Sequence, residues 1–154
     1  MENIKKLAFG TDHAATEIRE TVKKYLHDMG YEVEDFGFCG QGSCDYPDFA
    51  VQVAESVANK KADKGILICG TGIGMSIAAN KVKGIIAAVC WDKDTARLAS
   101  QHNCANILCL GSRTATLSEI CHRIKTFLNT PFEERHKKRI DKIKEIEKQQ
   151  YRCQ

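Results

Sequence analysis

The chain has 154 residues, 43% of them hydrophobic, and a formal net charge of +3. This length and composition predict a single globular domain over residues 1–154, large enough to bury a core. No apolar run approaches the roughly 20 residues of a membrane-spanning helix, and the apolar part of the N-terminus is too short for a secretory signal. We therefore expect a cytoplasmic protein that does not contact the membrane.

The hydrophobic pattern alternates between strands and helices along the chain. Strands are predicted at residues 6–9, 31–36, 66–68, 85–90 and 107–110. Helices are predicted at residues 14–29, 49–58, 75–80, 93–102 and 116–128, and a loop covers residues 37–47. A long final helix is predicted at about 131–150, beginning at Pro131. This order predicts an α/β fold, a three-layer α/β/α Rossmann-like sandwich with a five-stranded parallel sheet and a long C-terminal helix.

The most informative segment runs from Gly65 to Asn80, with the sequence GILICGTGIGMSIAAN. A buried strand ends at Cys69, and glycines at every second position follow before a helix begins. Backbone N–H groups in such a loop can face an anion, and the same field favours a thiolate over a thiol. A base or nucleophile beside an anion-binding loop indicates an enzyme. The alternative is a buried structural cysteine followed by glycines that only turn the chain.

Several polar side chains lie just past predicted strand ends. Asp12 and His13 follow the first strand, Cys69 ends the third, and Arg113 follows the fifth. Ligands of parallel α/β sheets bind beyond the carboxyl ends of the strands. This convergence favours the catalytic interpretation of Cys69.

Three familiar loop motifs do not fit residues 69–75. A CxxxxxR phosphatase loop needs arginine where Met75 stands, and no lysine is placed for a P-loop. A GxGxxG dinucleotide fingerprint has its third glycine one position early here. Asp92 nevertheless ends the next strand, about where a ribose-binding acid would lie. A nucleotide- or sugar-phosphate-binding module without catalysis therefore stays an alternative.

The eight cysteines include no CxxC pair, and the two CxxxxC spacings match no common zinc pattern. We therefore expect no metal, and we expect most of the thiols to be apolar fillers in a reducing compartment. The excess positive charge lies from Pro131 onward, with eight Lys or Arg and five Asp or Glu. A basic tail can bind RNA, but these alternating signs are typical of a solvated helix, so we expect no nucleic-acid partner.

Six short motifs follow one another in a recognisable order: GTDHAA at 10–15, DYPDFA at 45–50, CGTGIGMSIAANK at 69–81, QHN at 101–103, GSR at 111–113 and ERHKKR at 134–139. Together they resemble type B ribose-5-phosphate isomerases, within the wider ribose/galactose isomerase family. The resemblance covers nearly the whole chain. It implies interconversion of ribose 5-phosphate and ribulose 5-phosphate through a cis-enediolate, a reaction of the pentose phosphate pathway, without metal or cofactor.

The resemblance also implies roles at the glycine loop. Cys69 would be the base that moves a proton between C2 and C1. Another branch of the family carries Glu at the position of Met75, so Cys69 is the only candidate base at this loop. The enediolate oxygen would be stabilised by backbone amides of Gly70, Gly72, Ile73 and Gly74.

Ring opening and sugar binding are assigned by the same resemblance. His102 would open the sugar ring, with Asp12 and Thr71 assisting at the ring oxygens. Asn103 would hydrogen-bond the enediolate, and Tyr46 would line the sugar pocket. Without the resemblance, His102 would be interpreted as a solvent-exposed residue at a helix end.

The phosphate group would be bound by cationic side chains. Arg135 and Arg139 are spaced i, i+4 and so share one helix face, and His13 and Arg113 would complete the site. The resemblance implies a homodimer, or alternatively a tetramer, in which the neighbouring chain supplies His102, Asn103 and Arg113. The loop at residues 37–44 carries two cysteines and leaves the sugar length open, so allose 6-phosphate and galactose 6-phosphate are alternative substrates.

Overall fold

A computed structural model describes residues 4–37 and 42–151 of the chain. Its centre is a parallel sheet of five strands in the order β2-β1-β3-β5-β4. The strands are β1 (Lys6–Thr11), β2 (Glu32–Asp35), β3 (Lys64–Cys69), β4 (Ala87–Val89) and β5 (Ile107–Gly111). All five predicted strands are confirmed, and so is the α/β class.

Helices connect the strands and follow the last one. They are η1 (His13–Ala15), α1 (Thr16–Asp28), α2 (Tyr46–Ala58), α3 (Ile73–Ala79), α4 (Lys93–Gln101), α5 (Leu117–Asn129), η2 (Glu134–His136) and α6 (Lys137–Tyr151). Capping boxes at Asp92 and Thr116 fix the starts of α4 and α5, because each side chain accepts a hydrogen bond from the third helical residue. These caps bring both helices back toward the sheet directly after β4 and β5.

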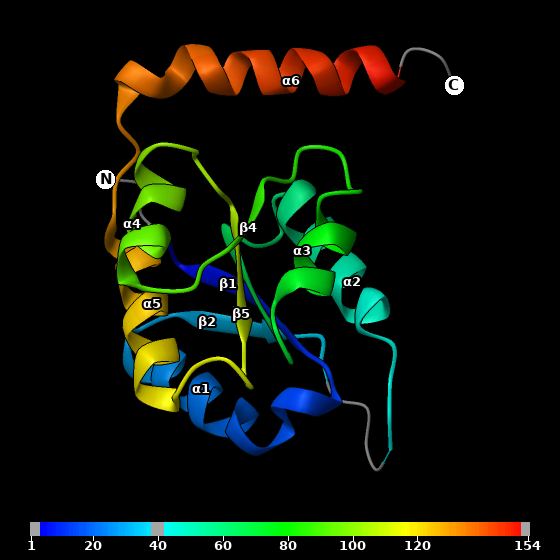
Figure 1. The fold of residues 1–154 in the computed structure, drawn as a ribbon, viewed down its shortest axis with the longest axis vertical. Coiled ribbons are helices and arrows are strands. Elements are labelled where there is room, and N and C mark those ends of the chain that lie inside the picture. Colours follow the sequence, from blue (N-terminus) through cyan, green and yellow to red (C-terminus); the bar gives the residue numbers. More distant parts are fainter. Residues whose placement is uncertain (1–3, 38–41, 152–154) are drawn as a thin grey trace.

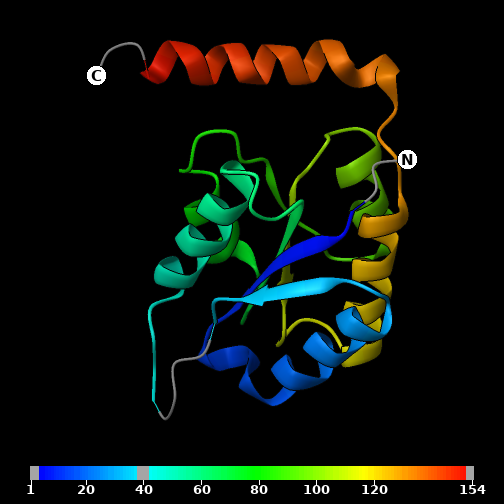
Figure 2. The same ribbon diagram turned by 180° about the vertical axis from the view of Figure 1, so that it is seen from behind.

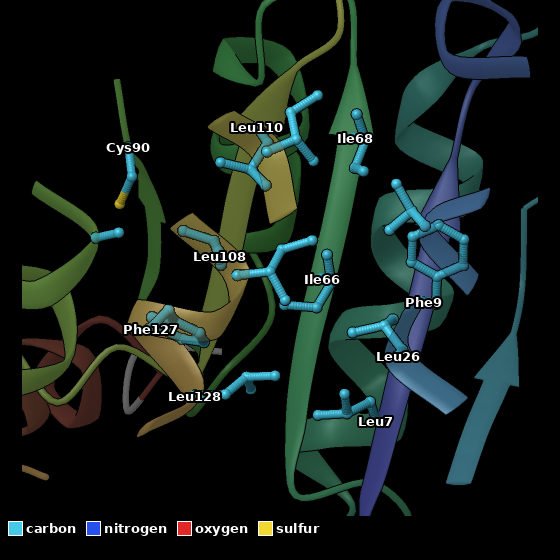
Figure 3. Packing of buried hydrophobic residues seen from close by; sticks show 14 of the residues in the cluster. Leu7, Phe9, Leu26, Ile66, Ile68, Cys90, Leu108, Leu110, Phe127 and Leu128 are labelled. Atoms are coloured by element: carbon cyan, nitrogen blue, oxygen red, sulfur yellow. The ribbon is translucent and has the colours of Figure 1, made fainter. Parts of the chain in front are cut away.

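The two faces of the sheet carry separate cores, as alternation along the strands requires. Figure 1 shows α4 and α5 on one side of the sheet and α2 and α3 on the other. In Figure 3, Leu7, Phe9, Ile66 and Leu108 extend from β1, β3 and β5 into the core that α1, α4 and α5 cover. Cys69 belongs to the opposite core, against α2 and α3. The sulfur therefore lies on the side of the sheet from which α3 departs.

The last helix begins later than predicted. Thr130 and Glu133 are extended, and α6 starts at Lys137 after one 3₁₀ turn. Pro131 disfavours a helical conformation in the preceding residue, which explains the extended Thr130. The backbone N–H of Glu133 also donates to the carbonyl of Gln101 at 2.9 Å. This bond ties the segment to the end of α4 instead of allowing it to form a helix.

Helix α6 crosses one end of the molecule, and α1 lies near the other end (Figures 1 and 2). Its Ile140 is buried, whereas Ile143 and Ile146 are 43% and 60% exposed. A cavity of about 970 Å³ lies between α6 and the amino-terminal edge of the sheet, with Asn106 and Ile140 in its wall. Helix α6 therefore presents an apolar stripe that this chain covers only in part. Among the described residues, no helix has both the length and the apolar character needed to cross a membrane.

Candidate active site

Cys69 is held at the mouth of the glycine loop. It is the last residue of β3, and its side chain is buried. The backbone N–H of Gly72 donates to the Cys69 Sγ atom at 3.2 Å. Gly72 is also the N-cap residue of α3, so one hydrogen bond fixes the sulfur relative to the helix start.

The loop can approach its neighbours this closely only because glycines form it. Gly72 has φ +81°, and a Cβ atom there would lie 3.0 Å from backbone atoms of Leu110. A Cβ atom on Gly74 would lie 2.5 Å from the ring of Tyr46. The Tyr46 ring therefore lies against the loop, at the first residue of α2. Two further loop residues, Thr71 and Ile73, are exposed, and the Thr71 hydroxyl accepts from the Ile73 amide at 3.3 Å.

Asp12 and His13 lie beside the same loop. The backbone N–H of Asp12 donates to the carbonyl of Ile68 at 3.2 Å, one residue before Cys69. The Asp12 carboxylate is buried and accepts from the Ala14 amide at 2.9 Å, which caps η1. His13 is exposed at this edge. The turn after β1 therefore presents an acid and an imidazole to the sheet edge at which β3 ends.

Arg113 also lies at this edge, in the same chain. Its backbone N–H donates to the Gly70 carbonyl at 3.0 Å, and its guanidinium group lies beside Gly70. The implication that a neighbouring chain supplies Arg113 is therefore wrong for this geometry. The reason is topological, because β5 pairs with β3 and the residues after β5 meet the loop after β3.

Ser112 lies in the GSR motif but is not among the predicted site residues. Its backbone N–H donates to the Cys69 carbonyl at 2.8 Å, and its hydroxyl donates to the carbonyls of Ala14 and Cys69 at 2.7 and 3.1 Å. It thus joins the ends of β1, β3 and β5. A serine after a strand gives no signal of such a role in the sequence.

These residues form the Cys69 cluster, which comprises Asp12, His13, Tyr46, Cys69, Gly70, Thr71, Gly72, Ile73, Gly74, Ser112 and Arg113. Two other buried cysteines, Cys90 and Cys109, lie outside this cluster. Burial raises the pKa of Cys90 to about 12 and raises that of Cys109 well above its usual value. Both thiols are therefore unreactive at neutral pH. Cys44 is disulfide-bonded, unlike the other cysteines in the described part of the chain.

His102 and Asn103 lie at the opposite edge of the sheet. His102 ends α4, and Asn103 follows it on the surface, before β5 begins. In the pairing of β3 with β5, the first residue of β5 is opposite Gly65 and the last is opposite Cys69. Four residue steps along the strand separate the two edges by about 13 Å. One chain therefore does not bring His102 to its own Cys69.

The two predicted phosphate-binding arginines lie with His102. The rings of His102 and His136 have centroids 4.2 Å apart, and Arg139 Nη1 lies 3.1 Å from His136 Nδ1. Arg135 Nε donates to Glu133 Oε2 at 2.5 Å. The residues that form this His102 cluster are His102, Asn103, Glu133, Arg135, His136 and Arg139. Sequence reasoning did not select Glu133 or His136.

The electrostatics of the His102 cluster fix two protonation states. Burial lowers the pKa of His136, and the neighbouring His102, Arg135 and Arg139 lower it further. The hydrogen bond from Arg135 lowers the pKa of Glu133. At neutral pH, His136 is therefore a neutral imidazole and Glu133 a carboxylate.

The fold is that of a parallel α/β protein, and the Cys69 cluster lies at the carboxyl edge of the sheet, where proteins of this class bind their ligands. The Ribose/Galactose Isomerase family profile matches residues 7–143. Ribose-5-phosphate isomerase B of Escherichia coli K12 is 43% identical over 145 residues, which are 94% of this chain and 97% of the relative. The chain therefore belongs to the ribose/galactose isomerase family.

Solved structures show the same similarity. Ribose-5-phosphate isomerase B of Clostridium thermocellum superimposes with a TM-score of 0.90 at 48% identity, covering 94% of this chain and 98% of that one. The Mycoplasma genitalium enzyme, solved with bound ribulose-5-phosphate, gives a TM-score of 0.88 at 43% identity, with coverage of 93% and 96%. Similarity over nearly full length confirms the Rossmann-like fold.

Proposed function

We propose that this protein interconverts ribose 5-phosphate and ribulose 5-phosphate, with Cys69 as the base. The observation that carries the proposal is the fixed Cys69 Sγ, which accepts a hydrogen bond from Gly72 at the start of a glycine loop. The printed names of relatives in E. coli and M. genitalium support this reaction and substrate. Allose 6-phosphate and galactose 6-phosphate remain the alternative substrates.

The proton transfer balances without any other reactant. The Cys69 thiolate takes the proton from C2 of the open-chain aldose, and the C–H electron pair forms the C1=C2 double bond of a cis-enediolate. The negative charge on oxygen is stabilised by amides of Gly70 to Gly74. The thiol then returns the proton to C1 while the proton on O2 passes to O1, leaving the carbonyl at C2.

Ring opening precedes this step because ribose 5-phosphate is mostly cyclic. It requires removal of the proton on O1 and delivery of a proton to the ring oxygen. We assign this exchange to His102, with Asp12 and Thr71 placing the ring oxygens and Asn103 binding the enediolate. Tyr46, which lies against Gly74, forms the wall of the sugar pocket.

A homodimer is part of the proposal, since the two clusters lie at opposite edges of one chain. A two-fold symmetric partner can place its His102 cluster over the Cys69 cluster, which makes two equivalent sites. His13 and Arg113 of one chain would then face Arg135 and Arg139 of the other across the phosphate. Exposed Ile73, Ile77 and Trp91 near the loop support a subunit contact there. A tetramer and the cytoplasmic location stay predictions.

The test is an isomerase assay with purified protein in EDTA, comparing kcat/KM for ribose 5-phosphate, allose 6-phosphate and galactose 6-phosphate. We expect ribose 5-phosphate to be preferred. Cys69→Ala should lower the rate about 10²–10⁴-fold, the usual contribution of an acid–base residue. The control is Cys121→Ala, which removes a free thiol on α5. Absence of turnover with all three sugar phosphates would end the proposal.

A further inference from the structure

One buried nitrogen in the His102 cluster has no hydrogen-bond partner. Among the buried side-chain nitrogen and oxygen atoms of the described residues, only His136 Nε2 makes no hydrogen bond. His136 is only 5% exposed, so water does not readily satisfy this atom. An unpaired buried polar atom costs free energy and therefore calls for an explanation.

Two potential ligand residues lie beside this atom. His102, Glu133 and His136 each offer a ligand atom, and these atoms lie within 4.8 Å of one another. The distance from His136 Nε2 to Glu133 Oε2 is 3.6 Å. Two ligand atoms of a tetrahedral zinc site are about 3.3 Å apart, given Zn–N and Zn–O bonds of about 2.0–2.1 Å. The side from His136 Nε2 to Glu133 Oε2 is close to this value, and the other two sides, each within 4.8 Å, must shorten when an ion binds.

Local structure explains why the three residues meet. Glu133 and His136 are spaced i, i+3 around the 3₁₀ turn η2, in which such side chains lie above one another. The Glu133 amide bonds to the Gln101 carbonyl, next to His102, which brings the turn to the end of α4. We propose that His102, Glu133 and His136 form a binding site for a divalent cation of the Zn²⁺ type, with the fourth coordination position open.

The surroundings support the carboxylate ligand. The side-chain amide of Gln101 donates to Glu133 Oε1 and orients the carboxylate, whereas Arg135 donates to Oε2, the oxygen 3.6 Å from His136 Nε2, and must leave it when an ion binds there. Hydrogen bonds of this kind orient ligating carboxylates in metal sites.

The guanidinium group of Arg139 weakens metal binding at this site, and a variant can test this effect. Its guanidinium group donates to His136 Nδ1, so the ring proton of the neutral imidazole lies on Nε2. Coordination through Nε2 moves that proton to Nδ1, and Arg139 must then leave the ring. Its positive charge also repels the cation. Arg139→Ala should therefore tighten metal binding.

Metal binding would couple to catalysis through His102. An imidazole that coordinates Zn²⁺ has no free lone pair for the proton exchange of ring opening. This consequence rests on the proposed role of His102, whereas the site itself does not. Zn²⁺ would therefore inhibit turnover of the cyclic sugar phosphate, and a chelator would restore it.

The direct test is titration of the full-length protein with Co²⁺, followed by absorption spectroscopy. We expect one ion per chain, with d–d bands but no sulfur-to-metal charge transfer. Glu133→Gln and His136→Gln should each weaken binding by at least about 10-fold, since even supporting partners of metal ligands contribute about 10–100-fold. His27→Gln, at the end of α1, is the control and should bind like the wild type.

Isomerase assays with added Zn²⁺ show whether the ion binds at this cluster or elsewhere, and whether it affects ring opening. Zn²⁺ inhibition that persists in His136→Gln, or a thiolate charge-transfer band, would place the ion on a cysteine and overturn the proposal. Failure of both Glu133→Gln and His136→Gln to change Co²⁺ affinity would also overturn it. Binding as expected without any inhibition would uphold the metal site and count against the role assigned to His102.

Discussion

Replacing Gly72 by alanine tests how the glycine loop holds Cys69. Gly72 has φ +81°, and a left-handed conformation costs an L-residue about 1–2 kcal/mol. Alanine regains about 0.4–1 kcal/mol by restricting the unfolded chain. The new Cβ would also lie 3.0 Å from backbone atoms of Leu110, and such overpacking costs about 1–3 kcal/mol. The net expected loss in the free energy of unfolding is about 2–4 kcal/mol.

Gly30→Ala is the matched control for this change. Gly30 has φ +90°, but a Cβ atom there would meet nothing within 4 Å. Only the backbone cost remains, so we expect a net loss of about 1 kcal/mol. Urea denaturation of both variants measures the difference, and an isomerase assay at a temperature where both are folded gives kcat. Gly72→Ala should also lower kcat, because the backbone must shift to accommodate the Cβ atom, and this moves the N–H that donates to the Cys69 sulfur. Equal losses of stability in the two variants, or an unchanged kcat, would contradict a role of Gly72 in holding Cys69.

Three further outcomes are expected. Ser112→Ala removes the hydroxyl that donates to the Ala14 carbonyl, so urea denaturation should show a loss of about 1 kcal/mol in the free energy of unfolding. The value of kcat/KM should also fall, because the strand ends separate. Unchanged stability would contradict the role of Ser112 in joining the strand ends. Arg113→Gln should raise KM for the sugar phosphate more than it lowers kcat, and a change in kcat alone would count against phosphate binding. Asp35→Asn should lose about 1–3 kcal/mol of unfolding free energy at neutral pH. Burial raises the pKa of Asp35, but hydrogen bonds from the Gly37 amide, Lys23 and Arg19 outweigh burial, so the net effect is a lowered pKa. The deficit relative to the wild type should begin to shrink below about pH 4, where the unfolded wild-type chain takes up a proton, and should go on shrinking until pH passes the lowered pKa of the native Asp35 carboxylate; a constant deficit would contradict this.

The hydrophobic pattern predicted the sheet well because buried parallel strands are continuous apolar runs. Residues 64–69 are buried without exception, and the predicted strand at 66–68 is the centre of this run. The position of the Cys69 cluster followed from strand ends alone, since every parallel strand delivers its next residues to one edge. Asp12 and Arg113 therefore lie at the edge that the strand pattern predicts, although the resemblance assigns Arg113 to a neighbouring chain.

Features that depend on contacts between distant segments were not predictable. The late start of α6 follows from a hydrogen bond between Glu133 and Gln101, which no local pattern contains. The approach of His136 to His102 depends on the same bond. The separation of His102 from Cys69 within one chain follows from the pairing of β3 with β5. The hydrophobic pattern does not reveal it, and only the family resemblance assigns His102 to a neighbouring chain. Motifs of one active site can therefore lie at two edges of a single chain.

In the proposed homodimer, each active site combines the Cys69 cluster of one chain with the His102 cluster of the other. The most direct measurement is complementation between Cys69→Ala and His102→Asn, both assayed on cyclic ribose 5-phosphate before and after mixing with reversible dissociation. In a mixed dimer, one site has both mutations and the other has an intact Cys69 and an intact His102. Random pairing then restores about one quarter of the wild-type activity per chain. Activity of the mixture no higher than the mean of the two separate variants would contradict a shared site.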